Sequence, residues 1–128
     1  MTANAEEQSK ISAELSRYAG GTTQWYSTPG YMFTYTDGIL ALVNLCRCKW
    51  LLDAIASYQG SIRKNHPQSE AWQFWELLVD ENNKAVLSCY PDDGEPAIAR
   101  QEIEYTDFPL SKIRVWLASG TLILPSEY

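Results

Sequence analysis

The sequence has little of what the common enzyme classes require. It contains one histidine, His66, which precedes a proline in a polar segment. Ser-His-Asp or Cys-His chemistry would have to use this side chain, and its position is typical of an exposed loop residue. The GxxxxGK[ST], GxGxxG, HExxH and CxxC motifs are also absent. We therefore expect a protein that is not an enzyme, with no catalytic residue, no cofactor and no metal site.

Long apolar runs are missing too. The longest candidate, Ile39 to Ala56, is interrupted by polar and charged residues, whereas a membrane span needs roughly 18 uninterrupted apolar residues. The first ten residues are polar and acidic, unlike a secretory signal. Of the three cysteines, Cys46 and Cys48 are two apart on an expected helix and point about 200° apart around its axis. We expect a cytoplasmic protein with three buried, unpaired thiols.

Acidic residues are plentiful and concentrated in one stretch. Residues 70–107 contain ten carboxylates against two basic residues, Lys84 and Arg100, which gives this stretch a charge of −8. Residues 1–69 and 108–128 each carry +1, so the sum is the net charge of −6. The ten acids are Glu70, Glu76, Asp80, Glu81, Asp92, Asp93, Glu95, Glu102, Glu104 and Asp107. A concentrated negative face repels nucleic acid and anionic membrane and attracts basic protein surfaces.

The composition predicts one domain over residues 1–128, long enough to bury a core. Hydrophobic residues make up 45% of the chain and aromatic residues 12%, with five Trp and eight Tyr. Charged residues make up only 20%, which is below the globular average. Much of the surface must then be uncharged polar or aromatic, and exposed Trp and Tyr are typical of interfaces.

The first half of the chain is predicted to contain two helical regions and a hairpin. Apolar spacing indicates an N-terminal helix over 3–18, within a segment 1–20 that ends at two glycines. A segment 21–60 combines a hairpin, with β-type runs at 22–27 and 31–35, and a central apolar helix over 38–58, with a break near Cys46 as one alternative. The polar residues 59–69 are predicted to form a loop.

The second half, residues 70–128, is predicted to form a meander. Strands are expected at 71–79, 85–90 and 97–105, followed by a helix from Pro109 to Leu117, with a strand as the alternative, and a closing strand at 121–124. Arg100, Glu102 and Glu104 alternate with Gln101, Ile103 and Tyr105, so one face is acidic and solvated. The predicted class is α+β, an antiparallel sheet of about four to six strands with two or three helices packed on one side.

The tripeptide Tyr-Thr-Asp occurs twice, at 35–37 and 105–107. Each copy ends a β-type run and precedes a candidate helix, so we interpret Asp37 and Asp107 as structural capping residues. The alternative is that the two carboxylates converge for acid–base work or to hold a cation. A third carboxylate, Asp53, lies within an apolar stretch, where Lys49 four residues earlier is a natural helical partner.

Four segments together resemble a known family. They are Tyr35-Thr36-Asp37-Gly38, Trp50-Leu51-Leu52-Asp53 with Ile55-Ala56-Ser57-Tyr58-Gln59, Tyr105-Thr106-Asp107-Phe108-Pro109-Leu110, and Leu124-Pro125-Ser126-Glu127-Tyr128. The sequence is similar to a family of short proteins with a domain of unknown function, found in bacteria, cyanobacteria and their phages and plasmids. The resemblance implies a prokaryotic host and transfers no catalytic or binding residue.

The leading hypothesis that follows is a non-enzymatic acidic binding protein from a mobile element, most specifically an anti-CRISPR-like inhibitor. Its partner would be a host protein or nucleoprotein complex whose basic nucleic-acid-binding surface it occupies, without direct contact with nucleic acid or membrane. The residues assigned to the partner surface are Asp80, Glu81, Asp92, Asp93, Glu95, Glu102 and Glu104.

Two alternatives stay open. The first is a divalent-cation-dependent hydrolase or nuclease that uses Asp37, Asp53 and Asp107. The second is an oligomeric structural module, for example a homodimer, whose exposed aromatic side chains bury one another.

Overall fold

A computed structural model of the protein describes residues 4–20, 24–92 and 94–128. The α-helices are α1 (Ala5–Leu15), α2 (Asp37–Cys46), α3 (Lys49–Ser57) and α4 (Gln59–Asn65), and short 3₁₀ helices follow at η1 (Pro67–Ser69) and η2 (Pro125–Glu127). The strands are β1 (Trp25–Tyr26), β2 (Thr34–Thr36), β3 (Trp72–Val79), β4 (Ala85–Tyr90), β5 (Ala99–Ile103), β6 (Lys112–Ala118) and β7 (Thr121–Ile123). The α+β class is confirmed.

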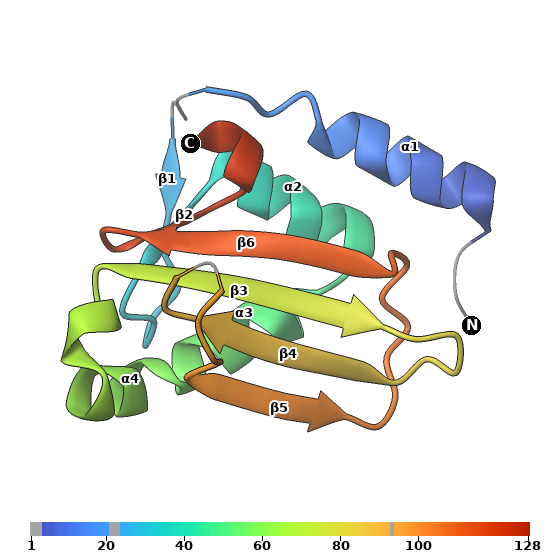
Figure 1. The fold of residues 1–128 in the computed structure, drawn as a ribbon. Helices are drawn as coiled ribbons and strands as arrows, with labels where there is room; N and C mark the ends of the chain where they lie inside the picture. Colours follow the sequence, from blue (N-terminus) through green and yellow to red (C-terminus); the bar gives the residue numbers. More distant parts are fainter. Residues whose placement is uncertain (1–3, 21–23, 93) are drawn as a thin grey trace.

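The described strands form one seven-stranded sheet in the order β1-β2-β7-β6-β3-β4-β5 (Figure 1). Its pairings are antiparallel except that β2 runs parallel to β7, with Thr34 opposite Thr121. The prediction of four to six strands, all antiparallel, is therefore wrong in two respects. The sheet has more strands than predicted, and one of its pairs is parallel. The parallel pair joins segments far apart in the chain, and local alternation carries no information about such a pairing.

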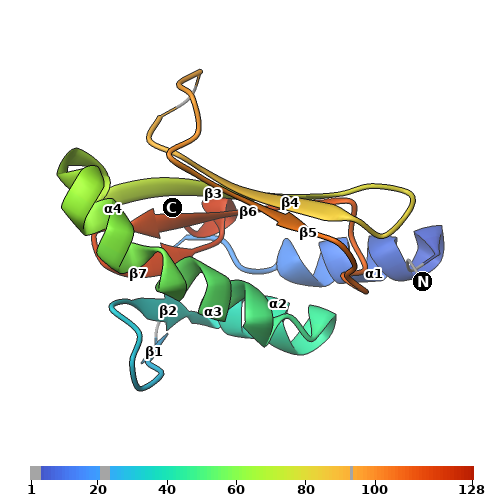
Figure 2. The same ribbon diagram turned by 90° about the horizontal axis from the view of Figure 1, so that it is seen from below.

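The helices pack on one face of the sheet. Figure 2 shows α2 and α3 on one side of the strands and the loop between β4 and β5 rising on the opposite side. The covered face carries the buried side chains of alternate strand positions, among them Trp75, Leu77, Leu87, Val115 and Leu117. The side chains of the intervening positions point to the other face, here called the open face.

The central helix is not continuous over 38–58, and the alternative of a break near Cys46 is correct. Helix α2 ends at Cys46, and Arg47 takes a left-handed conformation with φ of 52°. Helix α3 then begins at Lys49. A left-handed residue is a common way to end a helix, and here it turns the chain so that both helices bury apolar side chains against the sheet.

The prediction of a loop over 59–69 is wrong, because the segment contains α4 and η1. Helix α4 is short and polar, but Ile62 and Gln59 are buried. Gln59 forms a reciprocal pair of hydrogen bonds with Gln73 of β3, at 2.9 and 2.8 Å. A buried polar side chain with a specific partner anchors this helix, and its polarity in the sequence hides that role.

The prediction of a helix from Pro109 to Leu117 is also wrong, and the strand alternative is correct. Residues 112–118 form β6, which pairs with β3 on one side and with β7 on the other. Val115 and Leu117 are buried, which is the two-residue period of a strand. Two flanking strands supply hydrogen bonds along β6, and this outweighs the helical spacing of Ile113, Trp116 and Leu117.

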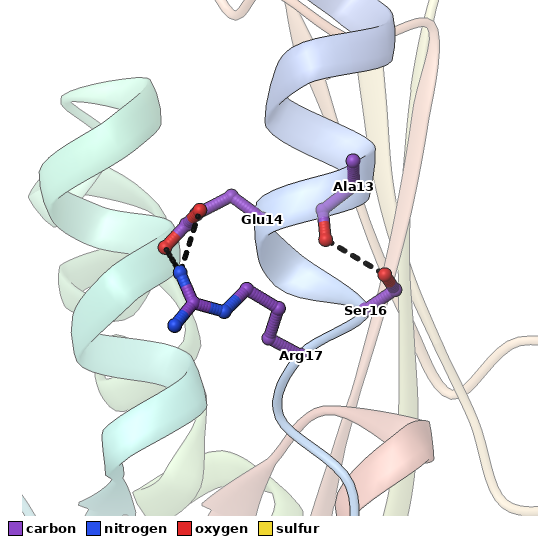
Figure 3. A network of polar contacts seen from close by, with 4 residues as sticks. All are labelled: Ala13, Glu14, Ser16 and Arg17. Atoms are coloured by element: carbon purple, nitrogen blue, oxygen red, sulfur yellow. Dashed lines mark hydrogen bonds and ion pairs between the residues drawn. The ribbon is translucent and has the colours of Figure 1, made fainter.

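The predicted N-terminal helix is confirmed as α1, which buries Ile11 and Leu15 against the core. At its C-terminal end Arg17 forms an ion pair with Glu14 at 3.0 Å, and the Ser16 hydroxyl donates to the Ala13 carbonyl at 2.7 Å (Figure 3). The end of α1 is thus closed by local polar contacts. Within the described part of the chain, no helix combines the length and apolar character needed to cross a membrane.

Candidate binding face

The structure divides the predicted acidic residues into two groups at opposite ends of the β3–β4–β5 meander. Asp80 and Glu81 lie in the turn between β3 and β4. Glu102 and Glu104 are at the same end, because Ile103 pairs with Ala85 at the start of β4. We call these four residues the turn-end acids. All four are exposed.

Asp92 and Glu95 lie in the loop that joins β4 to β5, at the other end of the meander, and are called the loop-end acids. Both are exposed. Asp93 was assigned to the same surface but lies outside the described residues. The described acids assigned to the partner surface therefore do not form one continuous patch. They lie in two groups, one at each end of the three strands β3, β4 and β5.

Some of these carboxylates also have structural contacts. Asp80 accepts hydrogen bonds from the backbone N–H groups of Asn82 and Lys84, both at 2.9 Å, which organises the β3–β4 turn. Glu102 lies 3.4 Å from Arg100 on the same strand. Both side chains of that ion pair are exposed, so the pair contributes little to stability.

The turn-end acids border a hollow of about 780 Å³. Its lining combines Asp80, Glu102 and Glu104 with one basic residue, Lys84, and with apolar side chains that include the exposed Leu78. An apolar floor with a charged rim is the general composition of a protein–protein contact surface.

Near the loop-end acids, where Phe74 pairs with Tyr90 at the end of β4, the open face carries an aromatic cluster. It consists of Trp72, Phe74, Trp116 and Tyr128, whose rings lie 5.3–6.5 Å apart by centroid. The first three side chains are half-buried and Tyr128 is exposed. The sequence predicts the strand that carries Trp72 and Phe74 but not the cluster, because it predicts a helix for the segment that contains Trp116.

A charged group lies beside this cluster. The carboxylate of Glu76 on β3 forms ion pairs with Arg114 at 2.9 Å and with Lys112 at 3.5 Å, both from β6. The Glu76 side chain is only 16% exposed, so its charge is balanced by two neighbours rather than by water. Of the ten acids in the −8 stretch, this one is neutralised within the sheet.

A second cavity of about 570 Å³ lies between the β4–β5 loop and the open face. Its lining is Phe74, Trp75, Glu76, Tyr90, Asp92, Gly94, Glu95, Arg114 and Trp116. The register places Phe74 between Tyr90 on β4 and Trp116 on β6, so three aromatic residues stand side by side across three strands. The cavity thus joins the aromatic cluster to the loop-end acids.

The two Tyr-Thr-Asp copies use threonine, not aspartate, for local capping. Thr36 is the N-cap of α2, and its hydroxyl accepts the Ile39 N–H at 3.3 Å. The Thr106 hydroxyl accepts a hydrogen bond from the Phe108 N–H at 3.1 Å, but in a loop and not at the start of a helix. The assignment of Asp37 and Asp107 as the caps is therefore corrected by one position. The buried threonine hydroxyl is the group that reaches the backbone, while Asp37 is half-buried and Asp107 is exposed.

The carboxylates proposed as a catalytic set have other surroundings. Asp37 accepts a hydrogen bond from Tyr26 of β1 at 3.0 Å, at one edge of the sheet, and Asp107 follows β5, the opposite edge strand. The hydrogen bond to Asp37 raises the pKa of the Tyr26 hydroxyl. Among residues 4–20, 24–92 and 94–128, no group of three or more His, Cys, Asp and Glu side chains is arranged to hold a metal ion.

Asp53 has the helical partner predicted for it. Lys49 lies 3.8 Å from its carboxylate, and the Tyr31 hydroxyl donates a hydrogen bond to the same oxygen. The Lys49 ammonium lies 4.8 Å from the centre of the Tyr31 ring. Burial and the Asp53 bond raise the pKa of Tyr31, and the contact with Tyr31 raises the pKa of Lys49. This exposed trio ties the β1–β2 connection to α3.

Comparison with known proteins gives one match. The family model described as "Family of unknown function (DUF6876)" matches residues 9–128. The chain belongs to this family. No match is found among curated proteins or among solved structures. The matched range contains both acidic groups, the aromatic cluster and both Tyr-Thr-Asp copies, so the candidate binding face lies within the family's domain.

Proposed function

We propose that the protein is a non-enzymatic binding protein whose open face docks on a basic surface of a partner protein. The observation that supports this most directly is the composition of that face. It has exposed acids at both ends and half-buried aromatic rings near the loop-end acids. Aromatic side chains supply contact area, and acids at the rim steer a basic partner and fix its orientation.

The more specific form of the proposal names the partner class. A surface that binds nucleic acid presents rows of Lys and Arg, and carboxylates spaced along a sheet can take the place of phosphates. We propose that the partner is a host complex that handles nucleic acid and that the protein acts as an inhibitor, in the manner of an anti-CRISPR protein from a mobile element. The net charge of −6 favours such a partner over nucleic acid itself.

The test is a pull-down with tagged protein from a prokaryotic lysate, followed by affinity measurement on the recovered partner at low and high salt. We expect recovery of a nucleic-acid-handling complex, weaker binding at high salt because screening shortens the reach of the charges, and competition by nucleic acid. The double variant Glu95→Gln/Glu104→Gln removes one charge from each end of the open face and should weaken binding about tenfold or more.

The chain offers a matched control. Glu6→Gln/Glu7→Gln removes the same amount of charge from α1, away from the open face, where both side chains are exposed. This variant should bind as the wild type does. Equal loss of affinity in both variants would show that only net charge matters, and unchanged affinity in the Glu95/Glu104 variant would remove the open face from the proposal.

A further inference from the structure

We propose that the cavity between the β4–β5 loop and the open face receives an arginine side chain from the partner. The inference rests on the proposed function, because it names the group by which a basic surface engages this face. It is a statement about a single site, the cavity of about 570 Å³, and not about the acidic stretch as a whole.

The first argument is the shape and chemistry of the cavity floor. Phe74 and Trp116 meet edge to face, with centroids 5.4 Å apart and an angle of 78° between the rings. Both residues line the cavity, and so does Tyr90 on the neighbouring strand. A planar guanidinium stacks on aromatic faces, and it is less strongly hydrated than an ammonium group.

The second argument is charge. The described residues that line the cavity include three carboxylates, those of Glu76, Asp92 and Glu95, and one basic residue, Arg114, so the formal charge of these residues is −2. Glu76 is already paired with Arg114, and the exposed carboxylate of Glu95 provides negative charge on the side of the loop. Anionic ligands are repelled by such a lining, and a cation that carries several N–H donors is favoured.

Two backbone hydrogen bonds hold described residues of the β4–β5 loop. The Ile98 N–H donates to the Cys89 carbonyl at 2.8 Å, which fixes the returning end of the loop to β4. The Glu95 N–H donates to the Asp92 carbonyl at 3.3 Å, and Gly94 has a φ of 80°, a conformation that suits glycine. The loop projects from the sheet on the side away from the helices (Figure 2), so a protein surface can approach the cavity directly.

The volume suits a side chain with its flanking backbone. Binding sites for small molecules measure about 300–1,000 Å³, so a cavity of about 570 Å³ lies within the usual range. A lysine would bring the same charge, but as a compact point charge that neither stacks on the rings nor forms a two-pronged contact with a carboxylate. Arginine therefore matches both the aromatic floor and the acidic wall.

The experiment is an NMR titration of the ¹⁵N-labelled protein with the peptide acetyl-Gly-Arg-Gly-amide. The comparison peptides carry lysine or citrulline, and citrulline has nearly the shape of arginine without its charge. We expect saturating shifts at the Trp116 indole N–H and at the Gly94 and Glu95 amides. Affinity for the citrulline peptide should be about five- to tenfold lower, since both stacking of a cation and pairing with a carboxylate are lost.

Two variants make the result specific to the cavity. Glu95→Gln should lower the affinity for the arginine peptide about two- to fivefold, and Glu7→Gln, with the same change in charge at an exposed position of α1, should leave it unchanged. Equal effects of the two variants, equal binding of the citrulline peptide, or shifts that do not centre on the loop and the Trp116 indole would each overturn the inference.

The outcome also separates this inference from the proposed function. A salt-sensitive partner recovered by the wild type, together with no binding of the arginine peptide, would overturn the arginine site and leave the binding function standing. Binding of the peptide together with no recovered partner would support the arginine site and count against the proposed docking on a host complex.

Discussion

The carboxylate of Glu127 lies against Gly38, in the space that any larger side chain at position 38 would need. A Cβ atom there would be 2.5 Å from the nearest Glu127 oxygen. The same carboxylate accepts hydrogen bonds from the Thr36 hydroxyl at 2.6 Å, the Gly38 N–H at 3.2 Å and the Leu124 N–H at 2.9 Å. An acid from the end of the described chain thus completes the N-terminus of α2, where negative charge is favourable.

Gly38→Ala should destabilise the protein by about 1–3 kcal/mol, because the added methyl displaces the Glu127 carboxylate from its donors. The measurement is thermal or urea unfolding. Gly60→Ala is the matched control, since Gly60 lies in α4 with open space around it. There the change should be neutral or stabilise by up to about 1 kcal/mol, because alanine favours helix. Destabilisation of the same size at both positions would contradict the role of Glu127.

The Gln59–Gln73 pair should behave as one unit. Either single change to leucine leaves a buried amide without its partner and should cost about 1–3 kcal/mol. The loss of stability in the double variant should be smaller than the sum of the two single losses by about 1 kcal/mol or more. Some loss remains, because the Trp75 indole N–H donates to Gln73 at 2.9 Å and has no acceptor in the double variant. Urea unfolding of the wild type, the two single variants and the double variant gives this coupling energy. Strictly additive losses of stability would show that the two amides act independently. Gln68→Leu, at an exposed position, should change stability by less than about 0.5 kcal/mol.

The three buried thiols predict a loss of stability at alkaline pH. Burial raises the pKa of Cys46 and of Cys89 from the ordinary value of 9.0 to about 12, and it raises that of Cys48 in the same direction. Between pH 9 and 12 the unfolded chain loses these protons and the folded protein keeps them. The free energy of unfolding should therefore fall by about 1.4 kcal/mol per pH unit for each thiol, in addition to other titrations.

The measurement is urea unfolding from pH 8 to 11 on the wild type and on Cys46→Ala. The variant should show a shallower decline, because one buried thiol has been removed. At pH 8 a thiol reagent should modify the native protein only as fast as it opens, since the thiols are buried and protonated. Rapid modification of all three cysteines without unfolding would contradict the structure.

Arg47 predicts an unusual order of substitutions. Its φ of 52° and ψ of 46° are left-handed, a region that disfavours side chains with a Cβ. Arg47→Gly should therefore be more stable than Arg47→Ala by about 1 kcal/mol in thermal unfolding. At Ser12, an exposed position inside α1, the order should reverse and alanine should be the more stable residue. The same order at both positions would rule out the left-handed turn between α2 and α3.

The parts of the fold that sequence predicted well are those determined by local pattern. Helix α1 and the strands β3, β4 and β5 follow from apolar spacing and turn residues, and the break near Cys46 is one of the two alternatives that the sequence leaves open. The ion pair of Lys49 with Asp53 follows from helical spacing alone. Each of these depends on residues a few positions apart.

The errors occurred where a distant partner decides the outcome. Helix α4 is anchored by Gln73 on β3, and β6 is a strand because β3 and β7 flank it. The candidate binding face has the same origin. Trp116 joins Phe74 only through the pairing of β3 with β6, and the loop-end acids reach this cluster only because their loop rises over the open face.

The sequence by itself determined the α+β class, the single acidic stretch, the aromatic surplus and the buried cysteines, because composition and short-range periodicity record them directly. The tertiary structure alone decided that the acids form two groups, that aromatic rings cluster near the loop-end acids, and that Glu127 closes the start of α2. The physical reason is that strand register and the burial of a carboxylate depend on contacts between residues far apart in the chain, which no local pattern specifies.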